Sequence, residues 1–138
     1  MIQRDLLQQQ IEQLGRAIGK IITGFLGLKS QGKVALGFEI ANEQFNKELD
    51  LDIDKLLGMD KVVLSDYLKE RQFTDVHLVQ IADYVEVLGE HQSDNAGKTN
   101  AFNTSLNLLA IANDKSEVYD MNRQLKIKEI EEKIKNLK

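Results

Sequence analysis

The sequence predicts an all-α protein of about six helices, arranged as three antiparallel helical hairpins. Apolar residues recur at spacings of three and four over most of the 138 residues, which is the period of an amphipathic helix. The strict alternation that is typical of β-strands is almost absent. The chain contains no proline, which argues against Pro-rich linkers and loop-heavy architectures. We expect residues 1–138 to form a single all-helical domain, long enough to bury a real core.

Two apolar seams predict the first two helices. The first seam has spacings of four and three and comprises Leu7, Ile11, Leu14, Ile18, Ile21 and Phe25. The second comprises Val34, Phe38, Ala41, Phe45 and Leu49. Gly15 and Gly19 lie beside the first seam, and a glycine inside a helix costs about 1 kcal/mol relative to alanine. We interpret this pair as a close approach of a neighbouring helix, with a break between the two helices near residues 27–32.

Capping residues place the helices in the middle of the chain. Asp54 is expected to cap a short turn through Leu57, while Asp60 and Thr74 are expected to be the N-caps of the third and fourth helices. The third helix carries Val63, Leu64, Tyr67 and Leu68. The fourth carries a buried stripe, Leu78, Ile81, Ala82, Val85 and Leu88, and is expected to end within residues 89–91.

A polar segment separates the last two predicted helices from the rest. Residues 93–100 (SDNAGKTN) lack a hydrophobic period and are predicted to be a loop. The fifth helix follows and ends near Asn113, with a polar face of Asn103, Thr104 and Asn107 and an apolar face of Phe102, Leu106, Leu108, Leu109 and Ala112. The last helix starts at about Glu117 and carries Ile127, Ile130, Ile134 and Leu137. Because no proline is available, we expect glycines to end the helices, namely Gly24, Gly27, Gly32, Gly89 and Gly97.

Two resemblances add to this interpretation. The spacing of Leu78, Ile81, Ala82 and Val85 is similar to that in the first helix of a tetratricopeptide repeat. The following loop is longer than in such repeats, Ser105 stands where an aromatic residue is expected, and no proline closes the unit, so an irregular helical bundle is the alternative. The opening, Met1-Ile-Gln-Arg-Asp with Ile11-Glu-Gln-Leu-Gly-Arg, resembles an uncharacterised family of small bacterial all-helical proteins. That resemblance implies no known activity, cofactor or catalytic residue.

Charge and composition limit the possible partners. The net charge of −4 is too small to require a nucleic acid or a membrane. Its distribution is uneven, because residues 39–94 contain 14 acidic and five basic residues whereas both ends are mildly basic. We expect the ends to pack near the acidic middle and the charges to lie on solvated faces. The alternative is an acidic surface for a basic partner.

The cysteine content and the apolar segments indicate the compartment. The absence of cysteine excludes a disulfide framework, a thiolate metal site and a cysteine nucleophile. The apolar stretch of residues 21–28 is far shorter than the about 20 residues that span a bilayer, and no cleavage pattern follows it. We expect a cytoplasmic protein without a membrane span.

Four patterns that could carry chemistry have simpler structural explanations. Asp50, Asp52 and Asp54 alternate as in a calcium loop, but Lys55 replaces the required glycine. Gly97-Lys98-Thr99 imitates the end of a phosphate-binding loop, but Gln92 replaces its first glycine. His77 and His91 are too far apart to meet on one helix, and His77 is expected to be exposed. The carboxylate pairs are expected on solvated helical faces, namely Glu48/Asp52, Glu86/Glu90 and Glu129/Glu132.

The basic residues near the C-terminus alternate with glutamates, namely Arg123, Lys126, Lys128, Lys133 and Lys135. This alternation predicts an ion-paired surface helix rather than a nucleic-acid site. We identify no catalytic, cofactor-binding or metal-ligating residue, and we expect no cofactor. The leading hypothesis is a non-enzymatic, helical-repeat-like module that binds another protein through a groove between hairpins or through an exposed terminal helix. The alternatives are a self-associating helical bundle, a small enzyme that uses inward-facing carboxylates, and a first helix that lies on a membrane surface.

Overall fold

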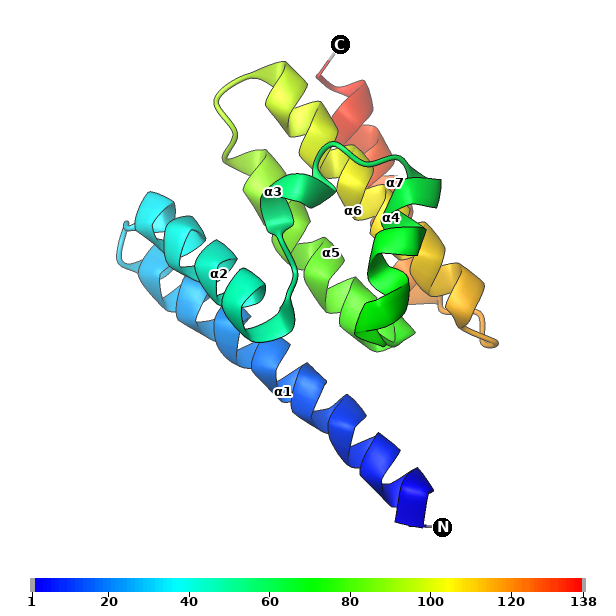
Figure 1. Cartoon of the computed structure of the whole chain (residues 1–138). Coiled ribbons are helices and arrows are strands. Elements are labelled where there is room, and N and C mark those ends of the chain that lie inside the picture. The colour runs from blue at the N-terminus through cyan, green and yellow to red at the C-terminus, as the bar shows by residue number, and fades with distance from the viewer. Residues whose placement is uncertain (1, 138) are drawn as a thin grey trace. The chain divides into compact units, whose positions relative to one another are not determined.

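The computed structural model describes the backbone of residues 2–137 and the side chains of residues 5–137. This part of the chain contains α-helices and no strand (Figure 1), which confirms the all-α class. The helices are α1 Ile2–Ser30, α2 Val34–Leu49, α3 Ile53–Leu56, α4 Lys61–Leu68, α5 Asp75–Glu90, α6 Asn95–Lys115 and α7 Met121–Lys135. There are seven α-helices in this range rather than six, because the turn expected from Asp54 to Leu57 forms the short helix α3. Helix α3 already begins at Ile53, so Asp54 lies inside it and the prediction that Asp54 caps it is wrong. None of the described helices is long and apolar enough to cross a membrane.

The chain divides into two compact units, Met1–Ile53 and Asp54–Lys138. In the first unit, α1 and α2 pack side by side and are joined by residues 31–33. Gly32 has a φ of +76° in this connection, a conformation that glycine adopts without strain. The predicted break near residues 27–32 is therefore confirmed, although α1 continues through Gly24 and Gly27.

Helices α1 and α2 approach closely at Gly37, a glycine that the sequence analysis did not single out. A Cβ added to Gly37 would lie 3.0 Å from the ring of Phe25, whose centroid is 4.6 Å from that of Phe38. A Cβ added to Gly19 would meet nothing within 4 Å, so the predicted close approach at Gly19 is wrong. The small residue that lets the two helices approach is Gly37 of α2, and α2 contains no other glycine that would have drawn attention to it in the sequence.

The second unit is built around the contact between α5 and α6. A Cβ added to Gly89 would lie 2.8 Å from the ring of Phe102 and 3.1 Å from Ala101 Cβ, so the two helices approach closely at this point. The Ser105 hydroxyl donates a hydrogen bond of 2.8 Å to the carbonyl oxygen of Ala82. The predicted α5 stripe is confirmed, since all five of its residues are buried.

The predicted caps of α4 and α5 are confirmed, but the predicted hairpins are not. Asp60 accepts a hydrogen bond of 2.9 Å from the backbone N–H of Val63, and Thr74 accepts one from the backbone N–H of His77. Helix α4 packs against α6, and α6 also packs against α7. The grouping into three hairpins assumed that α4 pairs with its neighbour in sequence, α5, and that arrangement is not confirmed.

The predicted loop at residues 93–100 is wrong, because α6 already begins at Asn95. Asp94 caps α6 by accepting a hydrogen bond of 2.7 Å from the backbone N–H of Gly97. A Cβ on Gly97 would lie 2.9 Å from the same Asp94 oxygen, so this glycine belongs to the cap rather than to a loop. The first turns of α6 have polar residues, which explains why no hydrophobic period reveals them.

The last helix also begins later than predicted, at Met121 instead of about Glu117. Asp120 caps α7 by accepting a hydrogen bond of 3.2 Å from the backbone N–H of Arg123. The intervening residues form a turn in which the Ser116 hydroxyl donates to the carbonyl oxygen of Val118. Lys138 lies outside the described residues, and so do the side chains of the Met1-Ile-Gln-Arg segment that carries part of the family resemblance.

Candidate functional site

A groove of about 450 Å³ lies in the second unit, between the N-terminal half of α6 and the turn that joins α3 to α4. We call it the amide groove. Helix α6 contributes Asn100, Asn103, Thr104, Leu106 and Asn107. The turn and the start of α4 contribute Leu57, Gly58, Met59, Asp60 and Lys61. The groove is therefore a mainly polar depression with three apolar side chains in its lining.

Three asparagine amides line the groove from one face of α6. Asn100, Asn103 and Asn107 are spaced at i, i+3 and i+7, which places them on successive turns of the same helix face. Asn100 and Asn103 are exposed, and Asn107 is half-buried. Within residues 2–137 none of the three side-chain amides has a hydrogen-bond partner. Each amide therefore presents two donors and one acceptor to the groove.

A buried hydroxyl fixes the base of the groove. The side chain of Thr104 is only 1% exposed, so the prediction that it belongs to a polar face of α6 is wrong. Its hydroxyl group donates a hydrogen bond that two carbonyl oxygens share, that of Leu56 at 3.2 Å and that of Asn100 at 3.0 Å. Since Leu56 is the last residue of α3, this contact ties α3 to α6. The two walls of the amide groove are thereby held at a set distance.

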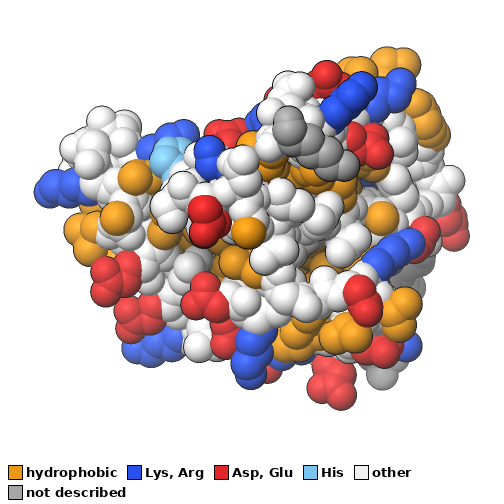
Figure 2. Space-filling view, turned by 90° about the horizontal axis from the view of Figure 1, so that it is seen from above, with side chains coloured by type: hydrophobic (Ala, Val, Ile, Leu, Met, Phe, Trp, Pro, Cys, Tyr) orange, Lys and Arg blue, Asp and Glu red, His pale blue; other side chains and the backbone are white. Residues whose placement is uncertain are grey.

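The amide groove carries no net charge. Lys61 forms an ion pair of 3.0 Å with Asp114 of α6, and Asp60 is engaged as the cap of α4. None of the ten described residues that line the groove is aromatic. Lys and Arg side chains are interspersed with Asp and Glu on the surface drawn in Figure 2, which shows no extended basic area. With Lys61 paired to Asp114 and no aromatic ring in the lining, the groove does not offer the row of cations and the stacking rings that single-stranded nucleic acids require.

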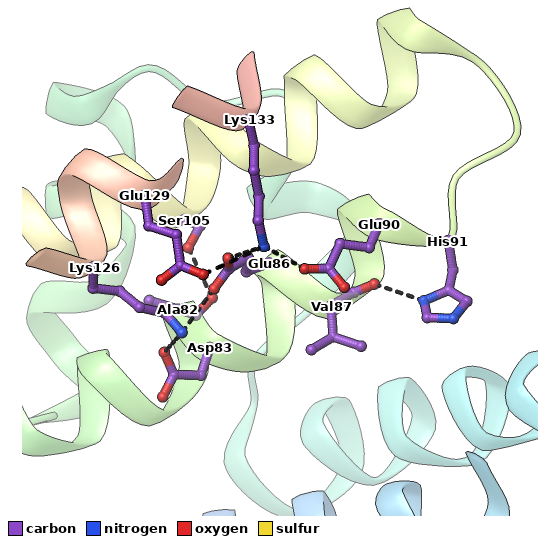
Figure 3. Close-up of polar contacts among 10 residues, drawn as sticks. All are labelled: Ala82, Asp83, Glu86, Val87, Glu90, His91, Ser105, Lys126, Glu129 and Lys133. Atoms are coloured by element: carbon purple, nitrogen blue, oxygen red, sulfur yellow. Dashed lines mark hydrogen bonds and ion pairs between the residues drawn. The ribbon is translucent and has the colours of Figure 1, made fainter. Parts of the chain in front are cut away.

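A cluster of titratable groups joins α5 to α7 (Figure 3). Glu86 of α5 is only 3% exposed, and its two oxygens contact Lys126 Nζ at 2.8 Å and Lys133 Nζ at 2.6 Å. Lys126 also contacts Asp83 at 3.1 Å, and Lys133 contacts Glu90 at 2.5 Å. The expectation that Glu86 lies on a solvated face is wrong, because α7 covers it. The expectation that the basic C-terminal end packs near the acidic middle is confirmed for α7.

The charges in this cluster stabilise one another. Burial by itself raises the pKa of Glu86, but the hydrogen bonds and charges of Lys126 and Lys133 outweigh burial and hold that pKa below its ordinary value. Burial lowers the pKa of each lysine, but their acidic partners outweigh it and raise the pKa of both. Glu86 is therefore an ionised carboxylate with both oxygens occupied by lysines. This arrangement holds α7 in place and does not provide a proton donor.

Arg123 extends the same contact towards the start of both helices. Its side chain is 6% exposed, and its guanidinium lies 3.7 Å from Asp75 of α5 and donates to the side-chain oxygen of Asn113 and to the carbonyl oxygen of Val118. The contacts with α5 thus advance in the same direction along both helices, from Asp75 with Arg123 to Glu90 with Lys133. Helices α5 and α7 are parallel, and one row of cations on α7 faces one row of carboxylates on α5.

The other candidate residues from the sequence occupy structural positions. Asp50 ends α2 with a φ of 51°, and the apolar residues Leu51 and Ile53 that follow it are buried. No group of three potential ligands that could hold a metal ion occurs among the described residues. The backbone N–H of Gly97, within the segment that imitates a phosphate loop, is already used by the Asp94 cap.

Both histidines contact the backbone of α5. His77 is 2% exposed, so the prediction of an exposed His77 is wrong, and its Nδ1 accepts a hydrogen bond of 3.1 Å from the backbone N–H of Thr74. This contact completes the reciprocal cap of α5 and keeps Nδ1 from binding a metal. His91 lies at the C-terminal end of α5, as predicted, with Nδ1 3.0 Å from the carbonyl oxygen of Val87.

The first unit has a depression of its own, of about 480 Å³, between α1 and α2. Its lining is largely apolar and includes Phe25, Leu28, Gly37 and Ile40. Few polar groups converge on it, so it offers little to orient a ligand. The amide groove is the better candidate site because its three asparagine amides are regularly spaced and unengaged.

The comparisons with known proteins add no relative. No protein-family model matches the chain, and neither the curated proteins nor the solved structures give a significant match. The candidate site therefore depends on its own geometry. The sequence predicted Asn103 and Asn107 on a polar helix face but missed Asn100, because residues 93–100 were assigned to a loop. With α6 extended to Asn95, Asn100 joins Asn103 and Asn107 on the same helix face.

Proposed function

We propose that this protein is a non-enzymatic interaction module that binds a polypeptide segment of another protein in the amide groove. The observation that carries the proposal is the row of unengaged amides of Asn100, Asn103 and Asn107 opposite the α3–α4 turn. A polypeptide presents one N–H and one carbonyl oxygen per residue, and an asparagine amide can satisfy both. The succession of α5, α6 and α7, each packed on the next, supports a helical-repeat-like arrangement for such a module.

A selection from a random peptide library tests this proposal. Peptides that bind the full chain are expected to lose most of their affinity for an Asn103→Ala variant. The matched control is Asn122→Ala, which removes an exposed asparagine amide on α7 outside the groove lining. Selected peptides that bind wild type, Asn103→Ala and Asn122→Ala equally well would contradict the proposal.

Self-association is the second candidate function, and an exposed apolar patch favours it. Four large side chains between the end of α6 and the first turns of α7 are 57–73% exposed, namely Val118, Tyr119, Met121 and Leu125. Exposed patches of this kind often mark protein contacts. If the patch joins two copies, sedimentation equilibrium will give a dimer for the wild type and a monomer for Tyr119→Ser. A monomeric wild type at high concentration would refute this candidate.

A further inference from the structure

We infer that the amide groove recognises an extended peptide through its main chain rather than through its side chains. This inference depends on the proposed function, and it names the class of ligand. The three amides of Asn100, Asn103 and Asn107 are uncharged and chemically identical, so they cannot distinguish an acidic from a basic ligand residue. They can, however, pair with N–H and carbonyl groups that every peptide carries.

The length of the row matches a short extended segment. Asn100 and Asn107 are seven residues apart in α6, and a helix rises 1.5 Å per residue, so the row is about 10 Å long. An extended chain advances about 3.3 Å per residue, so three residues cover this distance. Three amides therefore face about three peptide units.

The three asparagine amides also determine which conformation of the ligand can pair with them. In a helical ligand the main-chain donors and acceptors are already paired within the helix, except at its ends. An extended segment leaves them free, so only such a segment can use the whole row of amides. The requirement for free main-chain groups also separates this mode from the binding of an amphipathic helix, which depends on a continuous apolar groove.

The opposite wall allows variation in the side chains of the ligand. Leu57 and Met59 are half-buried and offer apolar contact, and the charge of Lys61 is engaged by Asp114. A Cβ added to Gly58 would meet nothing within 4 Å, so the wall is open at this point. Apolar contact with an open wall contributes to affinity but discriminates weakly between side chains.

Two scans of one selected peptide test the inference on the full chain. In the first, single main-chain nitrogens are methylated, which removes one donor at a time. In the second, single side chains are replaced by alanine. We expect methylation at the residues in the groove to lower the affinity of the peptide about tenfold, because one asparagine side chain of the groove then lacks its partner. Alanine replacement should lower the affinity less than about threefold. Methylation of a residue outside the bound segment is the control for changes in peptide conformation.

The Asn103→Ala variant makes this test specific. If Asn103 pairs with one main-chain N–H, methylation of that nitrogen will have no further effect on binding to the variant. Equal effects of methylation on wild type and variant, or larger losses from alanine replacement than from methylation, would overturn main-chain recognition while leaving a peptide-binding groove intact. Selected peptides that do not discriminate Asn103→Ala from wild type would instead overturn the proposed function itself.

Discussion

Helix α6 presents two faces that differ in chemistry and in packing density. The face towards α5 is buried, and at Gly89 it approaches so closely that the Phe102 ring leaves no space for a methyl group. The face towards the α3–α4 turn carries Asn100 and Asn103, which are exposed and unengaged. The face towards α5 therefore holds the second unit together, whereas the asparagine face is unengaged, as the proposed binding of a peptide requires. Substitutions on the two faces should therefore separate stability from binding.

The largest effect on stability is expected for Gly89→Ala. The added methyl group would lie 2.8–2.9 Å from two ring atoms of Phe102 and 3.1 Å from Ala101 Cβ, so α5 and α6 must move apart. Overpacking of this kind costs about 2–3 kcal/mol in the free energy of unfolding, which denaturant titration measures. Gly19→Ala is the matched control and should stabilise the protein by about 0.5–1 kcal/mol, because it has open space in α1. Equal effects of the two substitutions would contradict the close packing at Gly89.

The next largest effect is expected for Glu86→Gln, which removes the buried charge between Lys126 and Lys133. Removing one partner from a fully buried ion pair costs 3–5 kcal/mol, but both lysines are about 30% exposed and keep other acidic partners. We therefore expect a loss of about 2 kcal/mol. Glu90→Gln removes the more exposed carboxylate that contacts Lys133, and it should lower the free energy of unfolding by less than about 0.5 kcal/mol. A larger loss for Glu90→Gln than for Glu86→Gln would contradict the central position of Glu86.

The same cluster predicts how stability depends on pH. The pKa of Glu86 is lowered in the folded state, so its contribution is complete above its unfolded pKa of about 4.3 and is lost as the pH falls through the folded pKa. The pKa of Lys133 is raised, so its contribution is complete below about 10.4 and is lost as the pH rises through the folded pKa. Thermal unfolding between pH 3 and 7 should show a smaller acid destabilisation in Glu86→Gln than in wild type. If Glu86→Gln lost as much stability at acid pH as the wild type, Glu86 would not be a source of the acid destabilisation.

The sequence predicted the elements whose apolar period is regular and missed those that two different neighbours determine. The stripe from Leu78 to Leu88 in α5 was correct because its five apolar residues follow an unbroken helical period. In α6 both faces have contacts, so the buried Thr104 and Ser105 interrupt the apolar pattern and the polar first turns looked like a loop. The burial of Glu86 could not be predicted either, because only the tertiary position of α7 brings two lysines to it.

A smaller loss of stability is expected for Thr104→Val at the base of the amide groove. Valine has nearly the same shape, but it cannot donate to the carbonyl oxygens of Leu56 and Asn100. One lost buried hydrogen bond costs about 1 kcal/mol, and we expect this decrease in the free energy of unfolding. The affinity of the amide groove for a selected peptide should also fall, because the hydrogen bond that fixes α3 to α6 is lost. An unchanged stability would show that the hydroxyl does not hold these helices together.

The smallest effect on stability is expected for Asn103→Ala. The side chain is exposed and has no hydrogen-bond partner within the described residues, and alanine has the higher helix propensity. The free energy of unfolding should change by less than about 0.5 kcal/mol. A loss of more than about 1 kcal/mol would mean that Asn103 has a structural contact, and the amide row could not then be regarded as free for a ligand.

The most direct test of the account is a titration of the ¹⁵N-labelled full chain with a selected peptide, followed by NMR. We expect the largest shifts at the backbone amides of residues 57–61 and 100–107 and at the side-chain amides of Asn100, Asn103 and Asn107, and we expect Asn103→Ala to reduce all of them. Shifts confined to residues 118–125, or to the contact between α5 and α7, with the three asparagine side chains unchanged, would contradict the account.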